Sequence, residues 1–279
     1  MNIVPTAGKP RQIFAVLALN ANNIVPVRVL IEEVWGERPP RSAGTTLQTY
    51  VLQLRKRLAV ALGRNASRSP KDLLVTANGG YLLSVPAGSR DIEDFDRLTG
   101  RARRAGDPAE AFRLFNQALA LWRGSTLVDV PIGHTLEREV VRLEETRTKT
   151  LHERNEIGLQ LGLHAELLGE LAALSRSNPM DETIQGHFIV ALYRMGRTLD
   201  ALETYQRLRR TMVEELGLEP SDRLRELQRA VLASSPELDV PAARRRRLGA
   251  ASRQECPMCG GNFIRGWRAR QELMVPRVS

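Results

Sequence analysis

The most informative pattern of apolar and polar positions lies between residues 43 and 62. Leu47, Val51, Leu54 and Leu58 recur every three or four positions, so they share one side of a helix and are expected to face a core. The opposite side carries hydroxyls, amides and cations but no carboxylate, on Thr45, Thr46, Gln48, Thr49, Leu52, Gln53, Lys56 and Arg57. This pattern predicts an amphipathic helix whose polar face suits a polyanion.

A β-hairpin is predicted directly after this helix. The apolar run Leu73–Thr76 is followed by Asn-Gly-Gly and by a second run, Tyr81–Val85. Asn-Gly between two β-prone runs is a strong hairpin signal, because both residues tolerate positive φ. Periodic apolar positions also predict two earlier helices, over residues 10–19 and 27–35. Three helices followed by a hairpin outline a winged helix-turn-helix, although an ordinary helix and hairpin without a DNA role would show the same pattern.

The distribution of charge favours the DNA-binding interpretation. Residues 1–90 hold 12 Lys and Arg against 4 Asp and Glu, whereas residues 91–239 hold 20 against 26. Residues 240–279 hold 9 against 2. A basic segment that coincides with the predicted winged helix is the electrostatic footprint of a nucleic-acid partner. We therefore divide the chain into a DNA-binding domain (1–90), a middle domain (91–239) and a basic tail (240–279) that we expect to be disordered.

The middle domain reads as helical throughout and contains a weak repeat. A turn glycine, a small or apolar residue five positions later and a large apolar residue four positions beyond that recur three times, at Gly106/Ala111/Phe115, Gly162/Leu167/Leu171 and Gly196/Ala201/Tyr205. The last two are 34 residues apart, which is the period of tetratricopeptide repeats. Chance also produces such three-position matches in helical chains. The pattern predicts an all-α, tetratricopeptide-like array that binds proteins.

Other chemistries find little support in the sequence. The four His residues have no Cys or carboxylate partner at a catalytic spacing, so we expect neither an enzyme nor a bound cofactor. Cys256 and Cys259 resemble half of a zinc ribbon, but a structural zinc needs four ligands, which makes them a weak metal candidate. The sequence has no apolar stretch long enough for a membrane span and no signal peptide. We expect a cytoplasmic, nucleoid-associated protein without a membrane partner.

Several segments of the chain, taken together, resemble a known protein family. The segments IVPTAGKPRQIFAVLALNANNIVPV, EEVWGERPPRSAGTTLQTYVLQLRKRL and LLVTANGGYLLSV resemble the OmpR-type winged helix of the Streptomyces antibiotic regulatory protein family. The segments WRGSTLVDV and ELGLEPSDRLRELQRAVL resemble its bacterial transcriptional activation domain. The family's usual N-terminal sheet is missing, which suggests a truncated start. Leu52 and Ala77 stand where the family often has Ser and Arg.

The resemblance implies a transcriptional activator of an antibiotic gene cluster. Such an activator binds direct repeats in double-stranded promoter DNA, as a homodimer or in tandem, and recruits RNA polymerase. We predict that the polar face of the helix between residues 43 and 62 contacts DNA together with Asn78 and Tyr81 of the hairpin. The alternative is a protein-interaction adaptor whose winged helix does not bind DNA.

Overall fold

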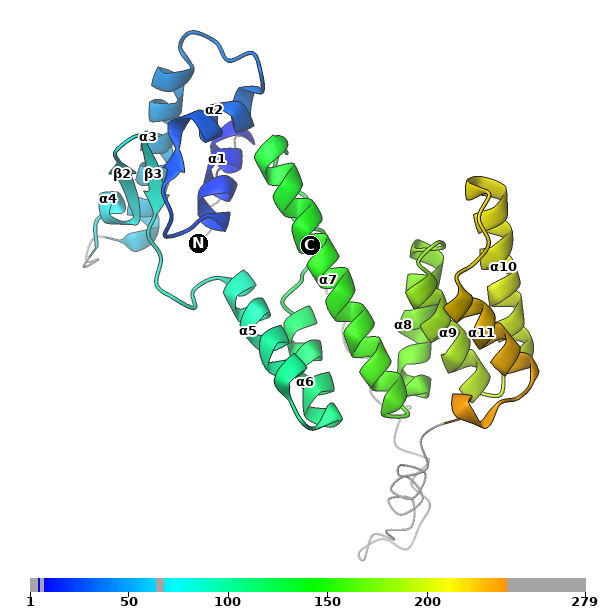
Figure 1. Cartoon of the computed structure of the whole chain (residues 1–279). Coiled ribbons are helices and arrows are strands. Elements are labelled where there is room, and N and C mark those ends of the chain that lie inside the picture. Colours follow the sequence, from blue (N-terminus) through cyan, green and yellow to red (C-terminus); the bar gives the residue numbers. More distant parts are fainter. Residues whose placement is uncertain (1–4, 6–7, 64–67, 240–279) are drawn as a thin grey trace, which may run out of the picture. The chain divides into compact units, whose positions relative to one another are not determined.

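The computed structural model describes residue 5 and residues 8–63 and 68–239, and it divides the chain into two compact units (Figure 1). The first unit extends to Gly158 and the second begins at Leu159. Most of the described residues are helical, and the strands form one small antiparallel sheet. The predicted fold class, a winged helix followed by an all-α domain, is confirmed.

Three helices open the first unit. They are α1 (Gly8–Leu19), α2 (Val27–Trp35) and α3 (Ala43–Leu62), and α3 has the extent that the apolar pattern predicts. The helix α2 ends at Gly36, whose φ of 63° is unfavourable for residues with a side chain. Pro39 and Pro40 then prevent an early restart, so that α2 and α3 form the two helices of a helix-turn-helix.

The wing is a three-stranded sheet in the order β1-β3-β2. The predicted hairpin is present as β2 (Leu74–Ala77) and β3 (Gly80–Leu83), with Thr76 paired to Tyr81. The apolar run begins one residue late as strand, because Leu73 ends a short helix, α4 (Pro70–Leu73), held by a capping box between Ser69 and Asp72.

The strand β1 (Val25–Pro26) was not predicted from the sequence. It pairs with β3 so closely that a Cβ on Gly80 would lie 2.4 Å from the carbonyl oxygen of Val25. The second glycine after Asn78 is therefore required by this contact rather than by the turn itself. Two residues are too short for a period-two pattern to reveal a strand.

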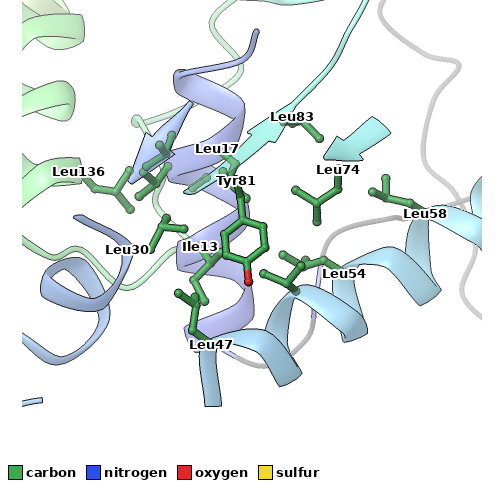
Figure 2. Packing of buried hydrophobic residues seen from close by; sticks show 14 residues of the cluster. Ile13, Leu17, Leu30, Leu47, Leu54, Leu58, Leu74, Tyr81, Leu83 and Leu136 are labelled. Atoms are coloured by element: carbon green, nitrogen blue, oxygen red, sulfur yellow. The ribbon is translucent and has the colours of Figure 1, made fainter. Parts of the chain in front are cut away.

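A single hydrophobic core holds the helices and the wing together (Figure 2). The predicted stripe of α3 enters this core, and all four of its apolar side chains are buried. The core also receives one side chain from far along the sequence, Leu136, which is fully buried. The apolar periodicity of α3 thus identified the face that packs, while the contribution of Leu136 depends on the tertiary fold.

The rest of the first unit comprises α5 (Asp91–Arg104), α6 (Pro108–Leu119) and α7 (His134–Gln160). Asp107 caps α6 and Pro108 occupies its first position, and the helix ends at Leu119. The second unit contains α8 (His164–Ser177), α9 (Glu182–Arg194), α10 (Thr198–Leu216), α11 (Asp222–Leu232) and a 3₁₀ turn (Pro236–Leu238).

The repeat positions have the packing roles that the sequence predicted. Each of the three glycines lies in the turn before a helix, namely α6, α8 or α10. All six apolar positions of the repeat are buried: Ala111, Phe115, Leu167, Leu171, Ala201 and Tyr205. Gly162 and Gly196 adopt φ values of 74° and 75°, so a residue with a side chain would strain these turns. The middle of the chain is built from packed helical hairpins.

Candidate nucleic-acid interface

The outward face of α3 carries the side chains that the sequence assigns to DNA. Six of them are exposed, namely Thr45, Gln48, Thr49, Leu52, Gln53 and Lys56. Thr46 and Arg57 are half-buried and lie together at one edge of this face. Since residues 45, 49, 52, 53 and 56 lie within about one third of the helix circumference, the structure gathers the predicted residues into one continuous surface.

This surface offers hydrogen-bond donors, hydrogen-bond acceptors and a cation. Gln48 and Gln53 offer both donors and acceptors, and Lys56 offers a cation. The hydroxyl of Thr49 donates to the carbonyl oxygen of Thr45 at 3.1 Å, which leaves its oxygen lone pairs as outward acceptors. The helix contains no Asp or Glu, so none of its own side chains repels a phosphate.

Arg55 links α3 to the wing, a role that the sequence analysis did not predict. Its Nε and Nη2 donate to the carbonyl oxygen of Leu74 at 2.9 and 2.6 Å, and Nη2 also donates to the Thr76 hydroxyl at 2.8 Å. Both acceptors belong to β2. Arg55 lies outside the polar face that the sequence analysis described, and the tertiary structure shows that its guanidinium is used within the protein.

The predicted wing residues separate into one exposed and one buried position. Asn78 is exposed at the tip, and the carbonyl oxygen of the adjacent Gly79 accepts from the backbone N–H of Val27 at 3.0 Å. Tyr81 is only 7% exposed and its ring lies among core side chains (Figure 2). Its assignment as a DNA contact is therefore corrected: side chains of a strand alternate between faces, and Tyr81 shares with Leu83 the face of β3 that packs on the core.

Aromatic contacts fix α2 against α3. The rings of Trp35 and Tyr50 are stacked with centroids 6.2 Å apart, and the Lys9 ammonium lies 5.2 Å from the centroid of the Trp35 ring. Such stacking and cation–π contacts stabilise a defined angle between the two helices. These contacts therefore hold α3 in a defined orientation relative to α2.

The wing has its own local support in α4. The backbone N–H of Ser69 donates to the Asp72 carboxylate at 2.8 Å, which lowers the pKa of Asp72 from its ordinary value. The Ser69 hydroxyl accepts from the Asp72 N–H in return. This carboxylate is therefore used to cap α4, which leads directly into β2.

Neither a metal site nor a membrane span is present in the described residues. Residues 8–63 and 68–239 contain no group of three or more His, Cys, Asp or Glu placed to hold a metal ion. In that part of the chain no helix is both long and apolar enough to cross a membrane. Burial lowers the pKa of His164 from its ordinary value, which favours the neutral form of this side chain. The predicted candidates Cys256 and Cys259 lie outside the described residues.

Comparison with known proteins decides the family. Residues 3–83 match the family described as transcriptional regulatory protein, C terminal, and residues 90–232 match the bacterial transcriptional activator domain. The chain is 49% identical over 250 residues to the regulatory protein DnrI of Streptomyces peucetius, covering 87% of this chain and 92% of DnrI. The chain belongs to the Streptomyces antibiotic regulatory protein family.

Two further family comparisons extend this result. The regulatory protein AfsR of Streptomyces griseus is 36% identical over 242 residues, which cover 85% of this chain but only 24% of AfsR. The structure of Mycobacterium tuberculosis EmbR in complex with a low-affinity phosphopeptide superposes with a TM-score of 0.76 at 30% identity, covering 89% of this chain and 65% of EmbR. As a member of the Streptomyces antibiotic regulatory protein family, the chain is a DNA-binding transcriptional activator of antibiotic biosynthesis.

Proposed function

We propose that α3 enters the major groove of promoter DNA with the exposed face described above, while Asn78 at the wing tip approaches the sugar-phosphate backbone. The observation that carries this proposal is the continuous face of α3, which is free of carboxylates and held by the core, by the Trp35–Tyr50 stack and by Arg55. An α-helix fits the major groove, where base edges present distinct donor and acceptor patterns. The fold presents such a helix without rearrangement.

Individual side chains have distinct roles in this proposal. Gln53 can form paired hydrogen bonds with adenine, Lys56 can donate to guanine, and Leu52 can contact a thymine methyl group. Arg57 at the edge of the face is assigned to a phosphate. A good base contact discriminates by about 1–3 kcal/mol, whereas a phosphate contact strengthens binding to all sequences alike.

Family membership supports a proposal for the target and the partners. We propose that the protein binds direct repeats near a promoter, in tandem or as a homodimer, and that it recruits RNA polymerase through residues 91–239 as part of the nucleoid. The match of residues 90–232 to an activator domain supports the recruiting role. The acidic balance of residues 91–239 disfavours a second DNA reader there. This role needs neither a cofactor nor a catalytic residue.

A salt titration with a promoter fragment and a random fragment tests the proposed reader. In the triple variant Thr49→Ala, Gln53→Ala, Lys56→Ala, we expect the preference for the promoter to fall by at least about tenfold. Gln206→Ala, Arg210→Ala, Thr211→Ala on α10 removes a matched set of side chains from the second unit and should leave binding unchanged. Equal affinity of the α3 variant and the wild type for each fragment would refute the assignment of these three residues to DNA.

A further inference from the structure

Glu33 is a buried carboxylate of α2 that is not used at the DNA-facing surface. The residue is only 3% exposed, and its carboxylate oxygens accept from three backbone N–H groups. Oε1 accepts from Gly133 at 2.7 Å, and Oε2 accepts from Thr135 at 2.7 Å and Leu136 at 3.2 Å. Gly133 immediately precedes α7, and Thr135 and Leu136 belong to its first turn. A residue of the helix-turn-helix therefore caps a helix that begins 101 positions later in the chain.

The site around this carboxylate is closely built. The side-chain amide of Gln12 in α1, itself 5% exposed, donates to the Glu33 backbone oxygen at 2.7 Å and to Oε1 at 3.1 Å. A Cβ on Gly133 would lie 2.2 Å from the Glu33 carbonyl oxygen and 2.7 Å from Oε1. Leu136, near the start of α7, is fully buried in the core of the winged helix. Position 133 consequently admits no side chain while the cap is formed.

A second contact joins the start of α5 to the end of α1. Arg90, immediately before α5, donates through Nη1 to the carbonyl oxygens of Leu19 at 3.2 Å and Ala18 at 3.4 Å, at the end of α1. Glu93 holds the guanidinium with contacts of 2.9 and 2.5 Å. A carboxylate at the start of a helix and a cation at its end both interact favourably with the helix dipole. Glu33 of α2 thus stabilises the start of α7, and Arg90 stabilises the end of α1.

We propose that Glu33 is a positioning residue that fixes α7 to the DNA-binding helices, so that α3 and the start of the activator domain turn as one body on DNA. The inference rests on the proposed function, because it concerns how DNA binding is converted into activation. The helices α2 and α3 share one core and one aromatic stack, so the orientation of α3 in the groove determines that of α2 and of Glu33.

A rigid joint makes activation depend on the helical phase of the DNA. Inserting about 5 base pairs between the binding site and the promoter turns a bound protein to the opposite side of the duplex, and about 10 base pairs restore it. With the joint intact, the first insertion should abolish activation and the second should preserve it in part. When the joint is loosened, transcription from the two templates should become more similar, while the affinity for DNA is maintained.

The test compares Glu33→Gln with Glu32→Gln in the full chain. Whichever way the amide introduced by Glu33→Gln turns, its NH₂ group faces N–H donors, which weakens the cap. Glu32 is the matched control, because it is the preceding residue on α2, is exposed and pairs with Arg28 of the same helix. We expect Glu33→Gln to speed proteolytic cleavage between residues 120 and 135 by about tenfold, as loss of charge-assisted hydrogen bonds implies.

The same variant should bind promoter DNA within about threefold of wild type, because its site is distant from the outward face of α3. The ratio of transcription between the 10- and 5-base-pair templates should fall by at least about threefold, since a looser joint weakens the dependence on phase. Glu32→Gln should match wild type in all three measurements. Gly133→Ala disrupts the same cap from α7 and should reproduce the result. If both variants fail to fold, Gln12→Ala removes a supporting donor and should show a smaller effect.

If a folded Glu33→Gln protein is cleaved at the wild-type rate and keeps the wild-type dependence on helical phase, the proposed joint is overturned. Equal effects of Glu32→Gln would also overturn it, because they would show that only the charge of α2 matters. Failure of the wild-type protein to bind the promoter would instead overturn the proposed function. Because the proteolysis measurement needs no DNA, these two failures are distinguishable.

Discussion

Replacing Leu136 by Ala should destabilise the DNA-binding helices, although this residue belongs to α7. The Leu136 side chain is fully buried in the cluster that includes Ile13, Leu30 and Leu47 (Figure 2). Truncating a buried leucine removes its transfer free energy and leaves a cavity, at a cost of about 3–5 kcal/mol. Domains are stable by only about 5–15 kcal/mol, so this change removes a large share of the stability of the first unit.

The measurement is denaturant unfolding combined with hydrogen exchange of α1 and α3. We expect the free energy of unfolding of the first unit to fall by about 3 kcal/mol and exchange in both helices to accelerate. Val141→Ala is the matched control, because this side chain on α7 is 53% exposed and its truncation should change stability by less than about 0.5 kcal/mol. A loss below about 1 kcal/mol for Leu136→Ala, or unchanged exchange in α1 and α3, would refute the shared core.

Further predictions concern the wing, the repeat and the tail. Arg55→Ala should weaken binding to specific and random DNA alike, measured by titration, because it frees β2 from α3 without removing a base contact; a selective loss of promoter binding would contradict this role. Ala201→Leu should lower the free energy of unfolding of the second unit by about 1–3 kcal/mol through overpacking, and Tyr205→Ala should lower it by about 3–5 kcal/mol. Both are measured by denaturant unfolding, with the exposed Leu199→Ala as the control. Removing residues 240–279, with their nine Lys and Arg, should lower nonspecific DNA affinity and flatten its salt dependence, because fewer counterions are released.

The sequence predicted those parts of the fold that depend on local periodicity and turn chemistry. The apolar stripe of α3, the Asn-Gly turn and the buried repeat positions Ala201 and Tyr205 all have this character. The strand β1 escaped prediction because its two residues are defined only by their pairing with β3. Tyr81 was misassigned because a hairpin's sequence does not show which of its faces is covered.

The candidate site was predictable to a similar degree. Amphipathicity separates the outward residues of α3 from its core residues, so the proposed reader could be identified before the structure was known. It also left Arg55 off the polar face, but it could not show that this cation bonds to the wing, because its acceptors on β2 lie about 20 residues further along the chain. Glu33 was missed for the same reason: its three partners lie about one hundred residues away.

The contacts of Glu33 and Arg90 also explain why similarity domains and compact units need not coincide in this chain. The two family matches meet between residues 83 and 90, where the linker leads from the wing to α5. The first compact unit nevertheless continues to Gly158. A fragment that ended near residue 90 would lose Leu136 from its core, and Glu33 would lose its three backbone N–H donors. A buried charge without partners is costly, so such a fragment must hydrate this carboxylate or rearrange α2, which packs against α3. The winged helix and the start of α7 are therefore coupled through a shared core and a shared helix cap.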